Sequence, residues 1–118
     1  MLFRGKQSSW ILGGYNYAFG QHYIFDKNNN AFSVHPDSIG QYIGAKDSSG
    51  AKVFTGDILE DSDGRPWLIS FGKNTQDNSI ASFTMKPLDS KSIYPIDKSI
   101  GRFTIIGNLF DNPSYRKR

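Results

Sequence analysis

The sequence predicts an all-β protein, built as a barrel or a sandwich, and three observations point to this class. Short runs rich in aromatic and β-branched residues recur at intervals of about 8–12 residues, and several alternate between apolar and polar positions. Twelve glycines and five prolines interrupt these runs, which favours turns over long helices. Nine Phe, six Tyr and two Trp among 118 residues are sufficient to fill the core of one small β domain.

The first 36 residues predict an N-terminal β layer, arranged as a hairpin or meander. Its strands are expected at residues 10–12 continuing through two glycines into 15–19, at 22–25 and at 31–34. The Asp and Asn residues of segment 26–30 predict a turn, because such side chains bond their own main chain. His35-Pro36 ends the layer, since proline restricts the residue before it and lacks an amide donor.

Residues 37–113 predict the barrel, with strands expected at 38–43, 57–60, 66–71, 80–85 and 103–106. Turns are expected at residues 47–50 and, with a strong hairpin signal, at Asp61-Ser62-Asp63-Gly64. Val53-Phe54 is expected to form a short helical turn. Residues 72–79 are expected to be a polar loop, and residues 86–98 a loop with a short extended piece. Ordered structure is expected to end at Pro113, leaving residues 114–118 as a mobile basic tail.

Charge and composition exclude several classes of site. The net charge is +3, and part of it comes from the tail residues Arg116, Lys117 and Arg118, so the remaining chain is close to neutral. Lys and Arg are interleaved with Asp elsewhere, which is not typical of a nucleic-acid-binding face. The absence of cysteine excludes disulfides and cysteine-based metal sites. No apolar run is long enough for a signal peptide or a membrane span, so an intracellular, cytoplasmic protein without membrane contact is expected.

Two local patterns resemble binding loops without meeting their requirements. Asp26, Asn28 and Asn30 have the spacing that begins a calcium loop, but Ala31 stands where such a loop needs glycine. A hairpin turn is therefore the favoured interpretation. Gly44, Gly50 and Gly56 are six residues apart, with no Gly-Lys-Ser/Thr sequence and no following helix. These glycines are expected to turn the chain between strands, with Asp57 accepting bonds from nearby amides.

No catalytic constellation is predicted. His22 and His35 are the only histidines, and neither lies in a pattern with an acid and a nucleophile. The acids Asp57, Glu60, Asp61 and Asp63 cluster in sequence, and paired carboxylates can carry out acid–base chemistry. The last two, however, fall at a hairpin tip, where solvated turn acids are usual. No catalytic, cofactor-binding or metal-binding residues are therefore assigned, and the protein is predicted not to be an enzyme.

An aromatic-rich segment precedes the predicted turn at 26–30. Its members are Trp10, Tyr15, Tyr17, Phe19, Tyr23 and Phe25, with Arg4, Lys6 and Lys27 close in sequence. Single-stranded nucleic acid stacks on aromatic residues that basic groups flank. A small β domain also needs aromatic residues in its interior, and packing has the stronger claim. Any of these side chains left exposed would mark a partner surface.

Several segments, following one another along the sequence, resemble motifs of the YopX family of phage and prophage proteins. The opening Phe3-Arg4-Gly5-Lys6 with Trp10-Ile11-x-Gly13, and the central Ile39-Gly40-Gln41-Tyr42-x-Gly44-x-Lys46-Asp47-x-x-Gly50, resemble its motifs. Phe54-x-Gly56-Asp57-Ile58 and the closing segment from Ile106 to Pro113 continue the match. Ala45 and Thr55 depart from it, since family members often carry a bulkier apolar residue and an acid there. The segments run from residue 3 to residue 113 in one order and spacing.

The resemblance implies an SH3-like β-barrel with the additional N-terminal hairpin or meander, a mobile-element origin and a bacterial cytoplasmic setting. It implies no catalytic residues. The first hypothesis is a non-enzymatic accessory protein that binds a host or phage protein, through exposed strand edges or aromatic side chains, or that forms homo-oligomers. The alternative is a nucleic-acid-binding barrel. The predicted binding residues are Trp10, Tyr15, Tyr17, Arg116, Lys117 and Arg118.

Overall fold

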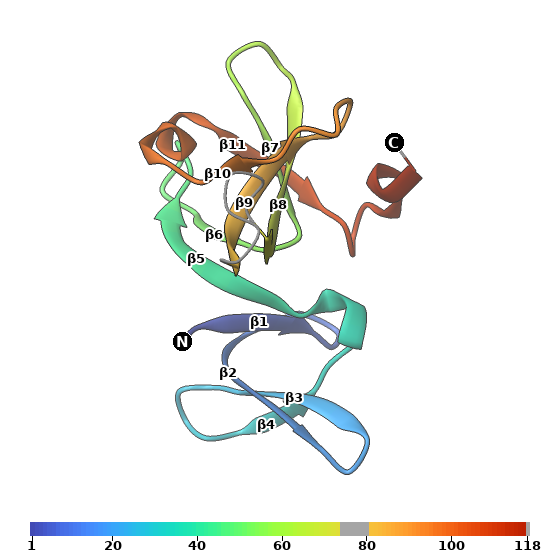
Figure 1. The fold of residues 1–118 in the computed structure, drawn as a ribbon. Helices are drawn as coiled ribbons and strands as arrows, with labels where there is room; N and C mark the ends of the chain where they lie inside the picture. The colour runs from blue at the N-terminus through green and yellow to red at the C-terminus, as the bar shows by residue number, and fades with distance from the viewer. Residues whose placement is uncertain (74–80, 118) are drawn as a thin grey trace. The chain divides into compact units, whose positions relative to one another are not determined.

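The computed structural model (Figure 1) describes residues 1–73 and 81–117. The chain divides into two compact units, Met1–Tyr42 and Ile43–Arg118. The described residues form antiparallel β-strands and three short 3-10 helices, with no α-helix among them. The predicted all-β class is therefore confirmed.

The first unit is a curled antiparallel sheet with the strand order β4-β3-β2-β1-β5. Its elements are β1 (Phe3–Lys6), β2 (Trp10–Ala18), β3 (Gln21–Phe25), β4 (Ala31–Ser33), the 3-10 helix η1 (Pro36–Ser38) and the beginning of β5 (Gly40–Lys46). The segments predicted at 10–12 and 15–19 form one continuous strand through the two glycines. The strand predicted from Ser38 begins at Gly40 instead, because Pro36 starts a 3-10 turn in which Ile39 N donates to Pro36 O.

Close packing explains two of the glycines inside these strands, Gly13 and Gly5. A Cβ atom on Gly13 would overlap the carbonyl oxygen of Phe25, in the neighbouring strand β3. A Cβ atom on Gly5 would lie 2.8 Å from Val34 Cγ2 and 3.0 Å from Ile24 Cγ1. Ile24 and Val34 are buried, so the small core of this unit closes over Gly5. After β4 the chain returns to β1, where His35 N donates to Lys6 O.

The second unit contains a five-stranded sheet with the order β10-β9-β8-β7-β11. Its elements after β5 are β6 (Lys52–Phe54), β7 (Asp57–Glu60), β8 (Pro66–Lys73), β9 (Ala81–Pro87), β10 (Tyr94–Pro95), η2 (Lys98–Arg102), β11 (Thr104–Asn108) and η3 (Pro113–Lys117). The helical turn predicted at Val53-Phe54 is wrong, because both residues belong to β6. Gly72 and Lys73, predicted as loop, extend β8. Residues 74–80, which held the rest of that loop and Ile80, lie outside the described residues.

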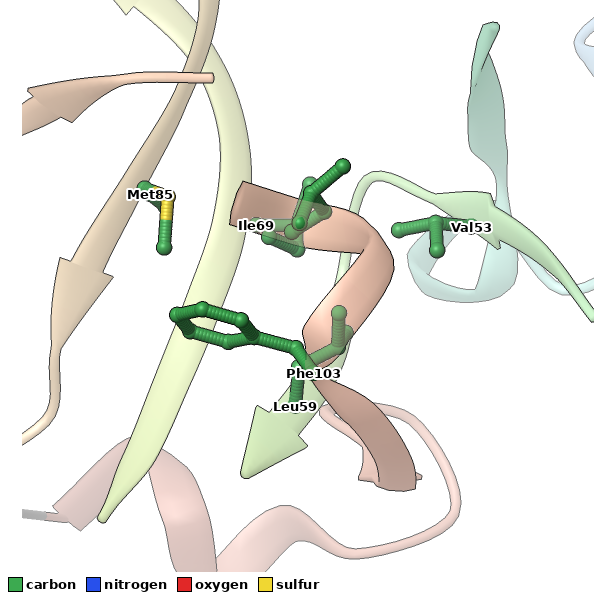
Figure 2. Packing of buried hydrophobic residues seen from close by; sticks show 6 residues of the cluster. Val53, Leu59, Ile69, Met85 and Phe103 are labelled. Atoms are coloured by element: carbon green, nitrogen blue, oxygen red, sulfur yellow. The ribbon is translucent and has the colours of Figure 1, made fainter. Parts of the chain in front are cut away.

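The core of the second unit gathers side chains from its strands and from the segment around η2 (Figure 2). Its buried members are Val53, Leu59, Ile69, Met85, Ile100 and Phe103. Trp67 lies against this core with its ring centroid 5.7 Å from that of Phe103. Residues 86–98 were expected to be a loop with a short extended piece, and β10 is a two-residue strand within them. Beyond that loop, Ile100 of η2 and Phe103, the first residue of the strand predicted at 103–106, both enter the core.

One type of turn joins three of the hairpins. Asp26, Asp47 and Asp61 each begin a turn in which the aspartate Oδ1 accepts from the backbone amides two and four residues ahead. The fourth residue of each turn has a left-handed backbone: Asn29, Gly50 and Gly64 have φ values of 65°, 87° and 79°. Asn and Gly tolerate this conformation best. The hairpin predicted at residues 61–64 is confirmed, and the calcium-like pattern at residues 26–30 forms such a turn.

Asp47 adds a long-range bond to its turn, because its Oδ2 accepts from Ile105 N at 2.9 Å. The side chain is buried, with only 6% of its surface exposed. Burial acts to raise the pKa of Asp47, but the donors from Ile105, Ser49 and Ala51 outweigh it and hold the pKa below the usual value of 3.8 for this side chain. The Asp47 carboxylate thus links the β5–β6 turn to β11 by a hydrogen bond.

The terminal strands of the sheets are short or carry side-chain bonds along their edges. In β11, Asp47 Oδ2 accepts from Ile105 N, and Asn112 Oδ1 accepts from Asn108 N at the other end of the strand. Strand β10 has two residues and contains Pro95, which lacks a donor. In β4, Ser33 O accepts from Gln7 Nε2 at 3.2 Å. Such devices limit pairing with another chain.

A closed SH3-like barrel is not confirmed. Both sheets are open in the described part of the chain, with β4 and β6 terminal in one strand order and β10 and β11 terminal in the other. The C-terminal end also differs from the prediction of a mobile tail after Pro113, because residues Pro113–Lys117 form the 3-10 helix η3. Tyr115 N donates to Asn112 O at the start of this helix.

Acid is expected to destabilise the second unit. The pKa of Asp47 and that of Asp61 are both lowered in the folded protein. A depressed folded pKa contributes stability above the unfolded pKa, near 3.8, and this stability is lost as the pH falls through the folded value. Urea midpoints followed by Trp67 fluorescence, in a Trp10→Phe background that leaves Trp67 as the single tryptophan, should therefore hold steady from about pH 7 to 5 and fall below about pH 4. A midpoint that is unchanged at about pH 3 would contradict this account.

Candidate functional site

The β2–β3 hairpin has an unusual composition for a surface element. Residues 7–25 contain no Asp, Glu, Lys or Arg, although these types make up 21% of the whole chain. The hairpin is nevertheless exposed at Leu12, Tyr15, Tyr17 and Phe19. Interfaces between proteins are depleted in charged residues at their centre and enriched in aromatic residues, so this hairpin is the candidate site.

Strand register places four aromatic side chains on one face of the sheet. Tyr17 pairs with His22, Tyr15 pairs with Ile24, and Phe3 pairs with Gly13. Because side chains opposite one another share a face and alternate residues of a strand do so too, Phe3, Tyr15, Tyr17 and His22 lie together. We call these four residues the ring row.

Contacts within the ring row hold its members in place. The Tyr15 hydroxyl and His22 Nδ1 are hydrogen-bonded at 2.6 Å. The ring centroids of Tyr15 and His22 are 5.8 Å apart, those of Tyr17 and His22 are 4.8 Å apart, and those of Phe3 and Tyr15 are 5.6 Å apart. Tyr17 remains 58% exposed. The row therefore presents aromatic surface to solvent, and each of its rings is in contact with another ring of the row.

Phe19 stands at the tip of the same hairpin and is 99% exposed. It forms a two-residue turn with Gly20, and both have positive φ, 52° and 76°. Turns of this type favour Asn-Gly or Asp-Gly, and a bulky residue with positive φ is a conformational outlier. Phe19 thus occupies a turn position that disfavours a bulky side chain, and its ring packs in no core. An outlier of this kind points to a functional role.

Trp10 lies on the opposite face from the ring row, and its ring interacts with cations. Arg4 Cζ is 4.6 Å and Lys6 Nζ is 5.5 Å from the Trp10 ring centroid. The register Lys6–Trp10 and Arg4–Leu12 places all of them on that face. Half-buried Trp10 and exposed Tyr15 and Tyr17, predicted together as binding residues, are therefore separated by the sheet.

The predicted basic binding residues belong to the second unit. Arg116 is exposed in η3. Arg118 and the side chain of Lys117 lie outside the described residues. In the sequence, Phe19 is one of several aromatic residues. Its full exposure could not be predicted, because it depends on a turn type that the neighbouring residues do not indicate.

Two of the four acids noted in the sequence, Asp57 and Asp61, have side-chain hydrogen-bond partners. Asp57 is 1% exposed, and its Oδ2 accepts from Phe54 N at 2.8 Å. This confirms the expectation that Asp57 bonds nearby amides. Asp61 Oδ2 accepts from Trp67 Nε1 at 3.0 Å. Burial acts to raise the pKa of Asp61, but the bonds from Trp67, Arg65 and Asp63 lower it overall.

The described part of the chain holds no clustered metal ligands, and its first unit has a groove with a single carboxylate. In residues 1–73 and 81–117, no three His, Asp or Glu side chains gather closely enough to hold a metal ion. A groove of about 670 Å³ in the first unit is lined by Leu2, Leu12, Phe25 and the turn from Asp26 to Asn28. Its one carboxylate, Asp26, accepts from the turn amides of Asn28 and Asn30. No helix in these residues is long and apolar enough to cross a membrane.

A family model described as YopX protein matches residues 5–115. The chain belongs to the YopX family. This match spans both structural units, from Gly5 in β1 to Tyr115 in η3, and it confirms the resemblance noted in the sequence. A comparison with curated proteins gave no match.

Proposed function

We propose that this YopX protein is a non-enzymatic accessory protein that binds another protein through the β2–β3 hairpin. The observation that carries the proposal is the charge-free surface of residues 7–25, with Tyr17 and Phe19 exposed. Large rigid aromatic side chains contribute most of the binding energy in many interfaces. Exposing them costs the isolated protein solvation free energy that a partner recovers.

Charge favours a protein partner over a nucleic acid. Strands of nucleic acid bind where cationic side chains track the phosphates beside stacking rings. The ring row has no Lys or Arg on its own hairpin, and Arg4 and Lys6 lie on the opposite face at the Trp10 ring. The arrangement of Arg4 and Lys6 at Trp10 is the observation that favours the nucleic-acid alternative, because it combines cations with an aromatic ring.

Strand edges offer a weaker route to a partner than the aromatic side chains. Side chains already bond backbone groups on three terminal strands. Gln7 donates to a carbonyl of β4, and Asp57 accepts from an amide of β6. Asp47 and Asn112 accept from amides of β11. A partner strand would have to displace these bonds before it could pair. The proposal therefore rests on side chains of the hairpin rather than on β-augmentation.

Family membership supports the wider setting of the proposal. We place the protein among phage-type accessory proteins that act in the cytoplasm of a bacterial host, and we keep the SH3-like barrel as a proposal for the second unit. The short antiparallel strands of that unit, joined in part by the turns that Asp47 and Asp61 begin, are typical of small barrels.

The test is capture of partners by the full chain and by hairpin variants. Tagged wild-type protein, a Tyr17→Ser/Phe19→Ser double variant and a Tyr94→Ser control are incubated with lysate of a bacterium that carries a YopX-encoding element, before and after nuclease treatment. Tyr94 is an exposed aromatic residue of the second unit, 47% exposed. We expect wild-type protein to capture one partner protein in stoichiometric amount, and nuclease treatment should not release it. The double variant should capture at least about tenfold less of this partner, and the Tyr94→Ser control should capture as much as the wild type.

Two outcomes would contradict the proposal. Equal capture by the wild type and by the double variant would show that the hairpin is not the contact surface. Recovery of nucleic acid alone, released as salt rises from about 50 to 200 mM, would favour the alternative function, because phosphate contacts are strongly salt-dependent.

A further inference from the structure

The ring row is too small for the standard surface between two folded proteins. It spans three neighbouring strands, β1 to β3, which is roughly 10 Å across at the usual strand spacing. A stable interface between folded proteins takes about 800 Å² from each partner, more than four rings offer when only Tyr17 among them is more than half exposed. A short segment of a partner chain fits the row better than a second folded surface.

The absence of charge limits the chemistry of that segment. Residues 7–25 carry no Asp, Glu, Lys or Arg, so the hairpin offers no ion pair to a charged ligand. What the row offers is aromatic faces and a few polar atoms at their rims. Tyr17 presents its hydroxyl from an exposed ring, and His22 retains Nε2 beyond the Nδ1 that bonds Tyr15. When Nδ1 accepts, Nε2 carries the proton and donates.

Rings with donors at their rims suit a polyproline II segment. This conformation has no internal hydrogen bonds, so its carbonyls accept from such donors, and its prolines pack on aromatic faces. The ligand is already extended and the rings of Tyr15 and His22 are already held by their bond, so both sides lose little conformational entropy on binding. A ligand that binds as a β-strand would instead need a free strand edge. The terminal strand next to the hairpin is β4, and its Ser33 O already accepts from Gln7, so this edge is less open to such a ligand.

From these observations we infer that the ring row, Phe3, Tyr15, Tyr17 and His22, binds a proline-rich, uncharged segment of the partner in the polyproline II conformation. This inference rests on the proposed function, because it names the chemistry recognised at the same hairpin. Phe19, at the hairpin tip, contacts the region of the partner that flanks this segment.

The test is a titration of the full chain with a synthetic oligoproline of about ten residues, followed by backbone amide chemical shifts. The matched peptide has alanine at every second proline, and the matched protein variants are Tyr17→Ser and the control Tyr94→Ser. We expect saturable binding with a Kd on the order of 10–100 µM, as for small interfaces. Shifts should centre on residues 15–22.

The comparison peptides and variants decide the outcome. Alanine in the peptide and Tyr17→Ser in the protein should each weaken binding by about tenfold, while Tyr94→Ser and a rise from about 50 to 200 mM salt should change it less than about twofold. No saturation below about 1 mM, equal binding of the alanine peptide, or unchanged binding by Tyr17→Ser would overturn the inference. If capture from lysate still required the hairpin, the proposed function would stand without it.

Discussion

Replacing Gly13 by alanine is expected to destabilise the first unit by about 3 kcal/mol or more. The added Cβ would overlap the carbonyl oxygen of Phe25 and lie 2.6 Å from its carbonyl carbon. No rotamer change relieves this contact, because every atom involved belongs to backbone or to Cβ. The β2–β3 pair has to separate, and the ring row loses its geometry with it.

The adjacent glycine provides a matched control. A Cβ atom on Gly14 would meet nothing within 4 Å, and its φ does not require glycine. Gly14→Ala is therefore expected to change stability by less than about 1 kcal/mol, in the stabilising direction if the unfolded chain loses freedom. Amide hydrogen exchange of Tyr15 to Tyr23 should report both variants. Similar exchange in the two variants would show that the close approach at Phe25 does not exist.

Asp47→Asn is expected to destabilise the second unit by about 2–3 kcal/mol. Both carboxylate oxygens of Asp47 face amide donors, with Oδ1 accepting from Ser49 and Ala51 and Oδ2 from Ile105. Asparagine has a single acceptor oxygen, so in either orientation its NH₂ group faces a donor. The site is buried, and water does not compensate for the lost bond.

Asp61→Asn is the control for the local turn, because Asp61 has the same bonds to the amides two and four residues ahead. Its other oxygen accepts from the Trp67 indole instead of a distant backbone amide. The Asp61 turn is more exposed to solvent, and the expected loss is about 1 kcal/mol or less.

Chemical denaturation followed by far-UV circular dichroism measures both variants, because this signal does not depend on the Trp67 indole. Asp47→Asn should also flatten the fall in stability below about pH 4. Equal losses for the two variants would show that the bond from Ile105 contributes no more than the bond from the Trp67 indole.

The candidate site was only partly predictable. Alternation along residues 15–19 places Tyr15 and Tyr17 on one face, and this much follows from the sequence. Trp10, predicted as a binding residue with them, lies on the other face, because residues on one face are an even number of positions apart and Trp10 is five positions from Tyr15. The partnership of Tyr15 with His22 depends on the β2–β3 register. That register is set by the turn at Phe19-Gly20, which lacks the usual Asn-Gly or Asp-Gly signal.

The sequence by itself determined the all-β class and most strands and turns of this protein, because these depend on alternation and on Asp, Asn and Gly chemistry within a few residues. The sequence also indicated the family, through the resemblance of its motifs between residues 3 and 113. Tertiary structure decided which glycines are irreplaceable and which acid is a long-range support. Gly13 and Gly14 are identical in sequence terms, yet only Gly13 meets the Phe25 carbonyl. Asp47 and Asp61 begin similar turns, yet only Asp47 reaches an amide 58 residues away. Such contacts arise from packing between distant segments, which no local pattern encodes.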